Sequence, residues 1–377
     1  MIAFVFGTTA EVIKAAPVLL SIEPTPLLIF TGQHNRGCDD LLERVGLHHP
    51  DARLVPPGSS DLASTSQAPG WAVRVARTAL RDRPVLRRRL VADGRPPCIL
   101  VQGDTLSTLA GTLIAKGIGA QVLHVEAGAR SGDLRNPFPE EAVRKTVDRL
   151  ADVMYAAGPG HAANLVRCSG DVVDTGVNTG FDALRLALAL PAAQEPPEGE
   201  FGIVTLHRFE LLRQPDLLRA TVHTLLSARP PVDRLVMPTD AHSRHYLKEA
   251  GVLDELEASD QVVLCPKVDY PTFQHWLVRS RFVVTDSGGL SQECGYLGMP
   301  CLIHREAEEG VSGDRGSLLL SRFDMDVLRA FLDNPPPRDG VQLADIPSPS
   351  QIIARDLERR GLAIALPAPA WSQAQEA

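Results

Sequence analysis

The sequence lacks several features that would assign it to a membrane-bound, secreted or nucleic-acid-binding class. None of its apolar runs approaches the ~20 residues that cross a bilayer, and the opening residues, MIAFVFGTTAE, have no basic segment typical of a signal peptide. The formal net charge of −8 at pH 7 argues against a nucleic-acid partner, because such proteins normally carry a basic surface. We therefore expect a cytoplasmic protein that binds neither membrane nor nucleic acid.

Cysteine and cofactor motifs are also scarce. The 377-residue chain has only six cysteines and no C-x-x-C pair, so we expect neither a disulfide framework nor a zinc site. The G-x-G-x-x-G fingerprint of dinucleotide-binding proteins and the P-loop of nucleotide triphosphatases are absent. The sequence thus implies no metal and no cofactor, although backbone amides and local basic groups can still hold an anionic ligand.

Short apolar strands alternate with amphipathic helical segments along the chain, which predicts parallel sheets covered by helices on both faces. The length suggests roughly two domains, and the Pro/Glu-rich segment PAAQEPPEGE (191–200) is typical of a surface connection between them. The predicted strands are 3–6, 26–30, 98–101, 121–125, 153–157, 172–174, 203–206, 234–237, 261–264, 282–285 and 300–303. The predicted helices are 11–21, 71–90, 106–116, 140–150, 161–167, 216–228 and 270–280.

Chemistry-bearing residues gather where these predicted strands end. In open α/β sheets, ligands bind outside the carboxyl ends of the strands, where loops lead into helices. These ends hold Gly7-Thr8-Thr9, Gly103-Asp104-Thr105, Glu126-Ala127-Gly128, His207-Arg208 and Ser287-Gly288-Gly289. We expect the carboxylates, the histidine, the basic side chain and the glycine-rich turns to face one cleft between the two domains, as in a catalytic site.

The stretch LHVEAGARSGDLRNPFPEEAVRK (123–145) places acids on both sides of a stiff loop. Glu126 ends a strand, and Glu140 and Glu141 open a helix that continues to Arg144. A structural explanation is available, because proline and acidic residues favour the first turn of a helix. The alternative explanation is acid/base chemistry.

The other motifs have structural alternatives as well. Ser287 and its two glycines either bind a phosphate at a helix N-terminus or form a tight turn with Ser287 as N-cap. Asp104 is either a catalytic acid or a routine N-cap, and Lys14 either reaches the cleft or is solvated. A lone histidine such as His207 is more often structural, although the adjacent Arg208 at a strand end favours a functional role.

The order of the motifs resembles the UDP-N-acetylglucosamine 2-epimerase family, in particular its non-hydrolysing bacterial branch. The matching segments cover nearly the whole chain to about residue 330, and HVEAGARSGDLRNPFPEEAVR is the most specific of them. The other segments are GTTAEVIKAAPVL, TGQHN, GDTLST, TGVNTGFDAL, TLHRFE and TDSGGLSQE.

This resemblance implies the GT-B fold, with two Rossmann-like domains spanning 1–176 and 177–348. A C-terminal helix at about 349–362 would pack back onto the first domain, ahead of a tail at 363–377. From its residues, the stretch PAPAWSQAQEA (367–377) of this tail is expected to be loosely ordered. The family also implies a homodimer, a UDP-sugar substrate and C2 epimerisation through anti elimination of UDP, a glycal intermediate and re-addition.

Site residues carry over from the resemblance position by position. Asp104, Glu126 and Glu140 match the acid/base groups, and His207 matches an acid or stabiliser on the diphosphate side. The phosphates and ribose would contact Ser287, Gly288, Gly289 and Glu293. The remaining substrate-binding positions are Lys14, Gln33, Arg144 and Arg208.

The sequence departs from the family pattern chiefly at basic positions. Thr9 stands where an arginine is expected and Ala10 where a proline is, Phe209 replaces the second arginine of HRRE, and Gly310 replaces a third arginine. Asp240 stands where a histidine is expected, and Gln292 replaces an acid. Keeping the acids while losing arginines favours the same chemistry on a different UDP-sugar, for instance UDP-glucose.

Three alternatives stay open at the level of the sequence. A hydrolysing relative would release the free 2-epimeric sugar and UDP. A GT-B glycosyltransferase would require an acceptor, and a non-catalytic sensor would bind nucleotide-sugars without exchanging the proton at C2.

Overall fold

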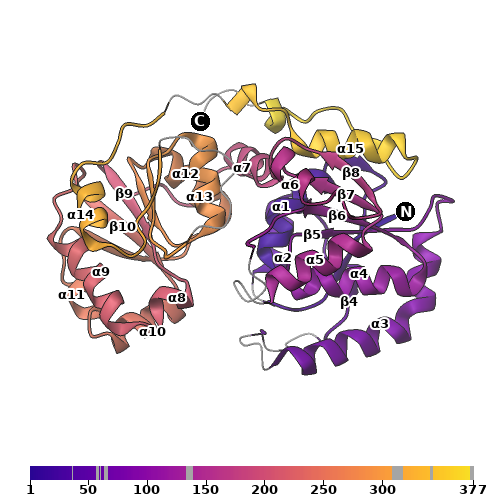
Figure 1. Ribbon diagram of the computed structural model, residues 1–377, viewed down its shortest axis with the longest axis horizontal. Helices are drawn as coiled ribbons and strands as arrows, with labels where there is room; N and C mark the ends of the chain where they lie inside the picture. The colour runs from indigo at the N-terminus through magenta and orange to yellow at the C-terminus, as the bar shows by residue number, and fades with distance from the viewer. Residues whose placement is uncertain are drawn as a thin grey trace. The chain divides into compact units, whose positions relative to one another are not determined.

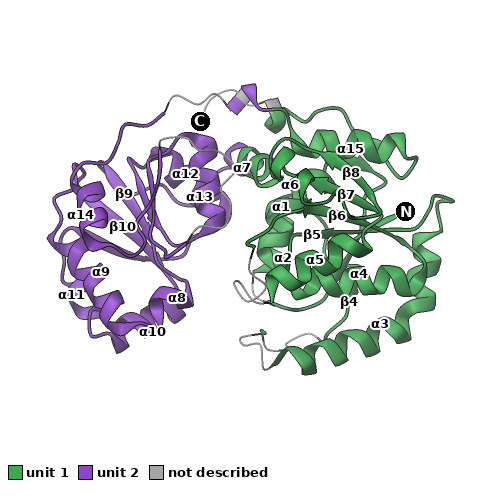
Figure 2. Cartoon of the chain, in the orientation of Figure 1, with its two compact units in different colours: residues 1–186, 347–373 green, residues 187–346, 374–377 purple. Residues whose placement is uncertain are grey.

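The chain folds into two compact units. The computed structural model describes residues 1–35, 37–56, 59, 61–62, 67–132, 139–307, 317–339 and 343–373. Within this part, unit 1 contains Met1–Leu186 and Pro347–Gln373, and unit 2 contains Ala187–Ile346 (Figure 2).

The division falls ten residues beyond the predicted boundary at 176, because the start of helix α7 (Gly180–Ala189) is fastened inside unit 1. The Asp182 carboxylate accepts hydrogen bonds from Ser348 Oγ at 2.6 Å and from Ser350 N at 2.8 Å. The second boundary falls after Ile346 rather than after 348, and the returning chain from Pro347 belongs to unit 1.

Unit 1 is built on a seven-stranded sheet in the order β4-β3-β1-β5-β6-β7-β8, in which every pairing is parallel (Figure 1). All five residues of β1 are buried, as expected for a strand covered on both faces. The strands are β1 (Ile2–Phe6), β3 (Leu27–Phe30), β4 (Ala52–Arg53), β5 (Cys98–Gln102), β6 (Gln121–Ala127), β7 (Val153–Ala156) and β8 (Asp171–Asp174).

Helices cover this sheet in two groups. Helix α1 packs against α2 and α15, and α4 packs against α3 and α5. Helix α6 is shorter than the predicted helix at 161–167. The helices are α1 (Thr9–Leu19), α2 (Cys38–Arg44), α3 (Ala68–Leu90), α4 (Leu106–Ile118), α5 (Glu140–Leu150), α6 (Pro159–Ala163), α7, α15 (Pro349–Arg359) and the 3-10 turn η3 (Ala370–Gln373).

The C-terminal segment adds a short strand pairing that the sequence did not predict. Strand β15 (Ile364–Ala365) pairs antiparallel with β2 (Ile22–Glu23), far away in the sequence. The preceding helix α15 is joined to strand β7 by Tyr155, whose hydroxyl donates to Asp356 at 3.0 Å. Residues 374–377 lie outside the described part of the chain.

Unit 2 has a six-stranded parallel sheet in the order β11-β10-β9-β12-β13-β14. The strands are β9 (Phe201–Thr205), β10 (Arg234–Thr239), β11 (Val262–Pro266), β12 (Val283–Thr285), β13 (Cys301–Ile303) and β14 (Leu318–Leu320). The helices are α8 (Phe209–Leu212), α9 (Pro215–Ser227), α10 (Ala241–Glu249), α11 (Leu253–Glu257), α12 (Tyr270–Arg279), α13 (Gly288–Leu297), α14 (Met325–Asp333) and the 3-10 turn η2 (Leu343–Asp345). The prediction of two Rossmann-like α/β domains is therefore confirmed.

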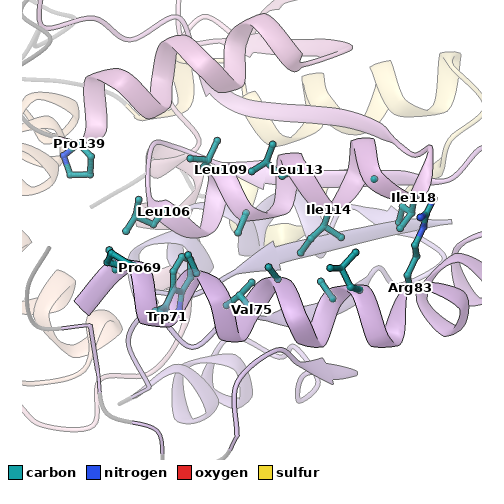
Figure 3. Close-up of a pocket in the computed structure, with 17 residues that line it drawn as sticks. Pro69, Trp71, Val75, Arg83, Leu106, Leu109, Leu113, Ile114, Ile118 and Pro139 are labelled. Atoms are coloured by element: carbon teal, nitrogen blue, oxygen red, sulfur yellow. The ribbon is translucent and has the colours of Figure 1, made fainter. Parts of the chain in front are cut away.

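An apolar groove of about 690 Å³ runs between α3 and α4 in unit 1 (Figure 3). Trp71 and Val75 line it from α3, and Leu109 and Leu113 line it from α4, whereas Arg83 is the one charged lining residue among those whose positions are described. None of the predicted site residues lines this groove. The candidate site therefore has to be sought elsewhere, at the carboxyl ends of the strands.

Candidate active site

The strand order identifies one candidate ligand-binding edge in each unit. In unit 1 the order reverses between β1 and β5, and in unit 2 it reverses between β9 and β12. Loops that leave neighbouring strands in opposite directions open a crevice at such a reversal. Asp104 follows β5, His207 follows β9 and Ser287 follows β12, so predicted site residues flank both reversals.

Glu126 has an unusual backbone and a basic partner. It lies at a register irregularity of β6 with a φ of 68°, in the left-handed region that non-glycine residues seldom occupy. Lys14 Nζ lies 2.8 Å from each carboxylate oxygen of Glu126, and Gln102 donates a further hydrogen bond at 2.8 Å. A strained residue held by several polar partners is typical of functional sites.

These partners determine the ionisation of Glu126. Burial by itself would raise the pKa of the carboxyl, but the charge of Lys14 and hydrogen bonds from Lys14, Asn178 and Gln102 hold that pKa below its ordinary value. Glu126 is therefore ionised at neutral pH. For Lys14 the sequence allowed either a side chain that reaches the cleft or a solvated one. In the structure Lys14 is paired with Glu126.

Asp104 is free of the capping role that was its structural alternative. The N-cap of α4 is Thr105, whose hydroxyl accepts from Thr108 N in a capping box. The Asp104 carboxylate instead pairs with Arg144 of α5, at 2.8 Å from Nε and 2.5 Å from Nη2. Two carboxylate–cation pairs thus stand near the β1/β5 reversal.

The acids at the start of α5 differ in their surroundings. Glu140 is the first residue of α5 and is partly buried, whereas Glu141 is fully buried and accepts from Ser131 N at 3.1 Å. Burial would raise the pKa of Glu141, but the Ser131 amide and the charges of Lys145 and Arg144 hold it below its usual range. Glu141 therefore anchors the loop to the helix, while residues 133–138 of the motif lie outside the described part.

The turn after β1 is held by a buried carboxyl that the sequence did not single out. Glu11 accepts from the amides of Gly7 and Thr8, at 2.9 Å each, and from the Thr105 hydroxyl at 2.8 Å. Burial raises the pKa of Glu11 to about 7, although these hydrogen bonds act in the opposite direction. Glu11 thereby joins the β1–α1 turn to the β5–α4 turn.

Gln33 belongs to the same network. Its side-chain oxygen accepts from Ser107 N at 3.1 Å and from Ser107 Oγ at 2.9 Å, which fastens it to the first turn of α4. This contact gives Gln33 a structural partner, and its role in binding substrate stays a prediction.

In unit 2, Asp286 organises the His207–Arg208 turn. Its carboxylate accepts from the backbone amides of both residues at 2.8 Å, and its other oxygen lies 3.1 Å from His207 Nδ1. Burial lowers the pKa of His207 more than the charge of Asp286 raises it, so the neutral ring is favoured at pH 7. Within the described part of the chain this second oxygen of Asp286 accepts no hydrogen bond, so the ring and the carboxylate lie close together without being hydrogen-bonded.

Ser287 and the following glycines open α13. Ser287 is the N-cap, and its hydroxyl accepts from Leu290 N at 3.4 Å, so the predicted capping role is present. Gly288 and Gly289 form the first turn, where backbone amides favour an anion. Glu293, one turn further on, accepts from Tyr270 Oη at 2.8 Å and Gln274 Nε2 at 2.9 Å.

Two of the departures from the family pattern have contacts of their own. Phe209 is 42% exposed and packs edge-on against His242 at a ring distance of 4.8 Å, with Arg213 over its ring at 4.2 Å. Asp240 caps α10 and pairs with Lys267 at 2.7 Å. Burial would raise the pKa of Asp240, but Lys267 and the Ser243 amide bring it to about 2.

The predicted residues thus divide between the units. Unit 1 carries Lys14, Gln33, Asp104, Glu126, Glu140 and Arg144, and unit 2 carries His207, Arg208, Ser287, Gly288, Gly289 and Glu293. The structure brings together Lys14 with Glu126 and Asp104 with Arg144. Asp286 was not among the predicted site residues, although it directly follows the predicted strand 282–285 and precedes Ser287.

Over the residues with described positions, no group of three or more His, Cys, Asp and Glu side chains could hold a metal ion. No helix in the same residues is long and apolar enough to cross a bilayer. The cytoplasmic location stays a prediction.

Comparison with known proteins identifies a family. A family model described as UDP-N-acetylglucosamine 2-epimerase matches residues 23–317. The UDP-N-acetylglucosamine 2-epimerase of Bacillus subtilis is 30% identical over 332 residues, which cover 85% of this chain and 83% of that protein. The UDP-2,3-diacetamido-2,3-dideoxy-D-glucuronate 2-epimerase of Pseudomonas aeruginosa is 28% identical over 321 residues, or 81% of this chain and 84% of that protein.

Solved structures show the same fold. The UDP-GlcNAc 2-epimerase from Neisseria meningitidis, bound to UDP-GlcNAc, aligns with a TM-score of 0.72 and 24% identity. The alignment covers 95% of this chain and 99% of that chain. Identity at this level establishes the fold and leaves the ligand of the present chain to be inferred from its own residues.

Proposed function

This chain belongs to the UDP-N-acetylglucosamine 2-epimerase family, and we propose that it epimerises a UDP-sugar at C2 by elimination and re-addition of UDP. The family assignment confirms the resemblance seen in the sequence and makes the chain an isomerase. The pairing of Glu126 with Lys14 and of Asp104 with Arg144, near the sheet reversal of unit 1, carries the proposal.

The reaction needs two proton transfers at one carbon. A carboxylate removes the proton from C2 while the C1–O bond to UDP breaks on the opposite face. A C1=C2 double bond forms, and UDP leaves with the electron pair of the broken bond. A proton delivered to the other face of C2, followed by return of UDP to C1, gives the epimer, so positioned acid and base groups are required.

The residues of unit 1 suit these transfers. A base must be ionised, and Glu126 meets this condition because Lys14 keeps its pKa low. Asp104 is held next to Arg144, and Glu140 begins the helix that carries Arg144. We assign these three carboxyl groups to the acid/base set.

The residues of unit 2 suit the diphosphate. Ser287, Gly288 and Gly289 present a hydroxyl and backbone amides at the N-terminus of α13, a favourable place for phosphate. His207, whose ring lies beside the Asp286 carboxylate, would stabilise or protonate the departing UDP. Arg208 would add a positive charge, and Glu293 would hold the ribose.

The sugar is proposed to differ from N-acetylglucosamine. Arginine makes bidentate contacts that threonine, phenylalanine and glycine cannot replace, and this chain has lost arginines at positions 9, 209 and 310, the last outside the described residues. The P. aeruginosa relative is named for a different UDP-sugar, so similarity of this order accommodates another substrate. We expect a UDP-hexose such as UDP-glucose to have a higher kcat/KM than UDP-N-acetylglucosamine.

A homodimer is part of the proposal. Light scattering of the purified protein should give twice the chain mass of 40.7 kDa. A mass of one chain at micromolar concentration would show that this part is wrong.

Incubation with a panel of UDP-sugars in deuterium oxide tests the reaction. We expect deuterium at C2 and the epimeric UDP-sugar as product, whereas accumulation of free sugar and UDP would identify a hydrolysing enzyme. Binding without exchange at C2 would identify a sensor, and turnover only with an added acceptor would identify a glycosyltransferase.

Substitution of the acids tests their roles. Glu126→Gln, Glu140→Gln and Asp104→Asn should each reduce turnover by roughly 100-fold or more, as for a lost acid/base group. Each change keeps the shape of the side chain. Near-normal turnover in all three folded variants would contradict the assignment.

A further inference from the structure

His124 is a buried histidine close to the acid/base residues, and it takes no part in the proposed reaction. His124 lies on β6, two residues before Glu126, and is 1% exposed. Its Nδ1 lies 2.8 Å from Asp148 of α5, and its Nε2 lies 2.8 Å from the carbonyl oxygen of Gly103. Gly103 immediately precedes Asp104.

Both ring nitrogens of His124 therefore face oxygen atoms that accept hydrogen bonds. A backbone carbonyl can only accept, and an ionised carboxylate can only accept as well. Burial would raise the pKa of Asp148, but His124 and Arg130 hold it below its usual range, so this carboxylate is ionised. Both hydrogen bonds form together only when the ring carries a proton on each nitrogen.

Asp148 is well placed to hold such a charged ring. It is fully buried, and Arg130 lies 2.7 Å from its second oxygen. The amide of Gly128 points to that same oxygen at 3.4 Å. One carboxylate thus faces donors from β6, from the loop after β6 and from a basic side chain.

The contact with Gly103 connects the two catalytic strands. The Gly103 amide donates to Val125 O at 3.0 Å, and the Gly103 carbonyl accepts from His124. Both polar groups of this glycine are thereby bound to β6, the strand of Glu126. A second link runs in parallel, because Arg144 and Asp148 lie one turn apart on α5 and Arg144 holds Asp104.

We propose that His124, doubly protonated and held by Asp148, is a positioning residue that fixes the turn carrying Asp104 relative to the strand carrying Glu126. The inference rests on the proposed function for its catalytic consequence only. The separation of two carboxyl groups that act on one carbon has to be maintained closely, since a misplacement of about 1 Å can cost on the order of 100-fold in rate.

Two variants with a matched control test the catalytic consequence. Glutamine at position 124 cannot donate to both Asp148 and the Gly103 carbonyl. Asparagine at position 148 places an N–H group opposite the donors that Asp148 accepts from. His124→Gln and Asp148→Asn should each lower kcat by roughly 10- to 100-fold. Their dissociation constants for UDP should stay within about twofold of the wild-type value, because the groups proposed to bind UDP lie in unit 2.

The control is His48→Gln, which removes an exposed histidine paired with Asp51 in the same unit and should leave kcat unchanged. The double variant His124→Gln/Asp148→Asn should be little worse than either single variant, because both break one network. Equal losses of kcat and UDP affinity would indicate general damage to the fold and overturn the positioning role.

Two further measurements need no substrate, so they decide the proposal even if no UDP-sugar is epimerised. NMR of protein with ¹⁵N-labelled histidine should show two ring N–H protons on His124 at the assay pH. Detection of only one would refute the doubly protonated ring. Hydrogen exchange of the segment that contains Gly103 and Asp104 should be faster in His124→Gln than in wild type and His48→Gln, and unchanged exchange would refute the positioning role.

Discussion

Replacing Lys14 by methionine tests whether the acid/base behaviour of Glu126 depends on its partner. Lys14 touches both carboxylate oxygens at 2.8 Å, and the two side chains are only 26% and 15% exposed. Solvent screens such a pair weakly. The substitution leaves the burial of Glu126 in place and removes the largest influence that opposes it.

The expected size follows from the contact. A hydrogen bond to a charged group contributes about 1.5–3 kcal/mol, and 1.36 kcal/mol corresponds to one unit of pKa. Loss of the ammonium should therefore move the acid limb of the kcat/KM profile upward by roughly 1 to 2 pH units. The direction is fixed, because an unopposed buried carboxyl binds its proton more tightly.

The assay is the rate of C2 deuterium exchange in a UDP-hexose between pH 5 and 9. Lys14→Arg keeps the positive charge and should restore the position of the limb. Lys145→Met is the matched control, since Lys145 pairs with Glu141 at 3.2 Å and not with Glu126. An acid limb that stays in place in Lys14→Met, with measurable activity, would refute the assignment of that limb to Glu126.

Three further outcomes are expected. Glu11→Gln should flatten the pH dependence of thermal stability. In the wild type the pKa of Glu11 is about 7, above the ordinary 4.5. Its burial as a neutral acid therefore contributes about 3 kcal/mol to the stability of the wild type below pH 4.5, and this contribution is lost as pH rises through 7. A melting temperature that falls between pH 5 and 8 to the same degree in both proteins would contradict this. Millimolar UDP should raise the melting temperature of the wild type and raise it less in Ser287→Ala; no shift with UDP but a shift with another nucleotide would redirect the substrate assignment. Asp182→Ala should speed hydrogen exchange in helix α15, because its carboxylate holds Ser348 and Ser350, and unchanged exchange there would show that these bonds do not fasten the helix.

Most of the sheets could be predicted because their strands are buried on both faces. A run such as Ile2–Phe6 is apolar at every position, which is a strong local signal. The two-residue strand Ala52–Arg53 gave no such signal, since it exists through its pairing with β3. Helix α10 was missed for a related reason, because its polar sequence AHSRHYLKE has little apolar periodicity.

The residues of the candidate site could be predicted from the sequence, but which of them contact one another could not. Strand ends and motifs identified Glu126 and Lys14 separately, but 112 positions separate them in the sequence. Only the order of strands in the sheet brings them together. Asp104 shows the same limit: its neighbour Thr105 takes the capping role, and the partner that remains for Asp104 is on another helix.

Two of the residues that depart from the family pattern are linked by contacts in the structure, and these contacts bear on which UDP-sugar the protein uses. Phe209 contacts His242, and His242 stands in the first turn of α10, whose N-cap is Asp240. Two replacements that are 31 positions apart in the sequence therefore meet at one helix end. Asp240 in turn holds Lys267, which places a positive charge at the end of β11. Linked contacts at the carboxyl edge of the unit 2 sheet are the arrangement expected if this edge accommodates a different nucleotide-sugar.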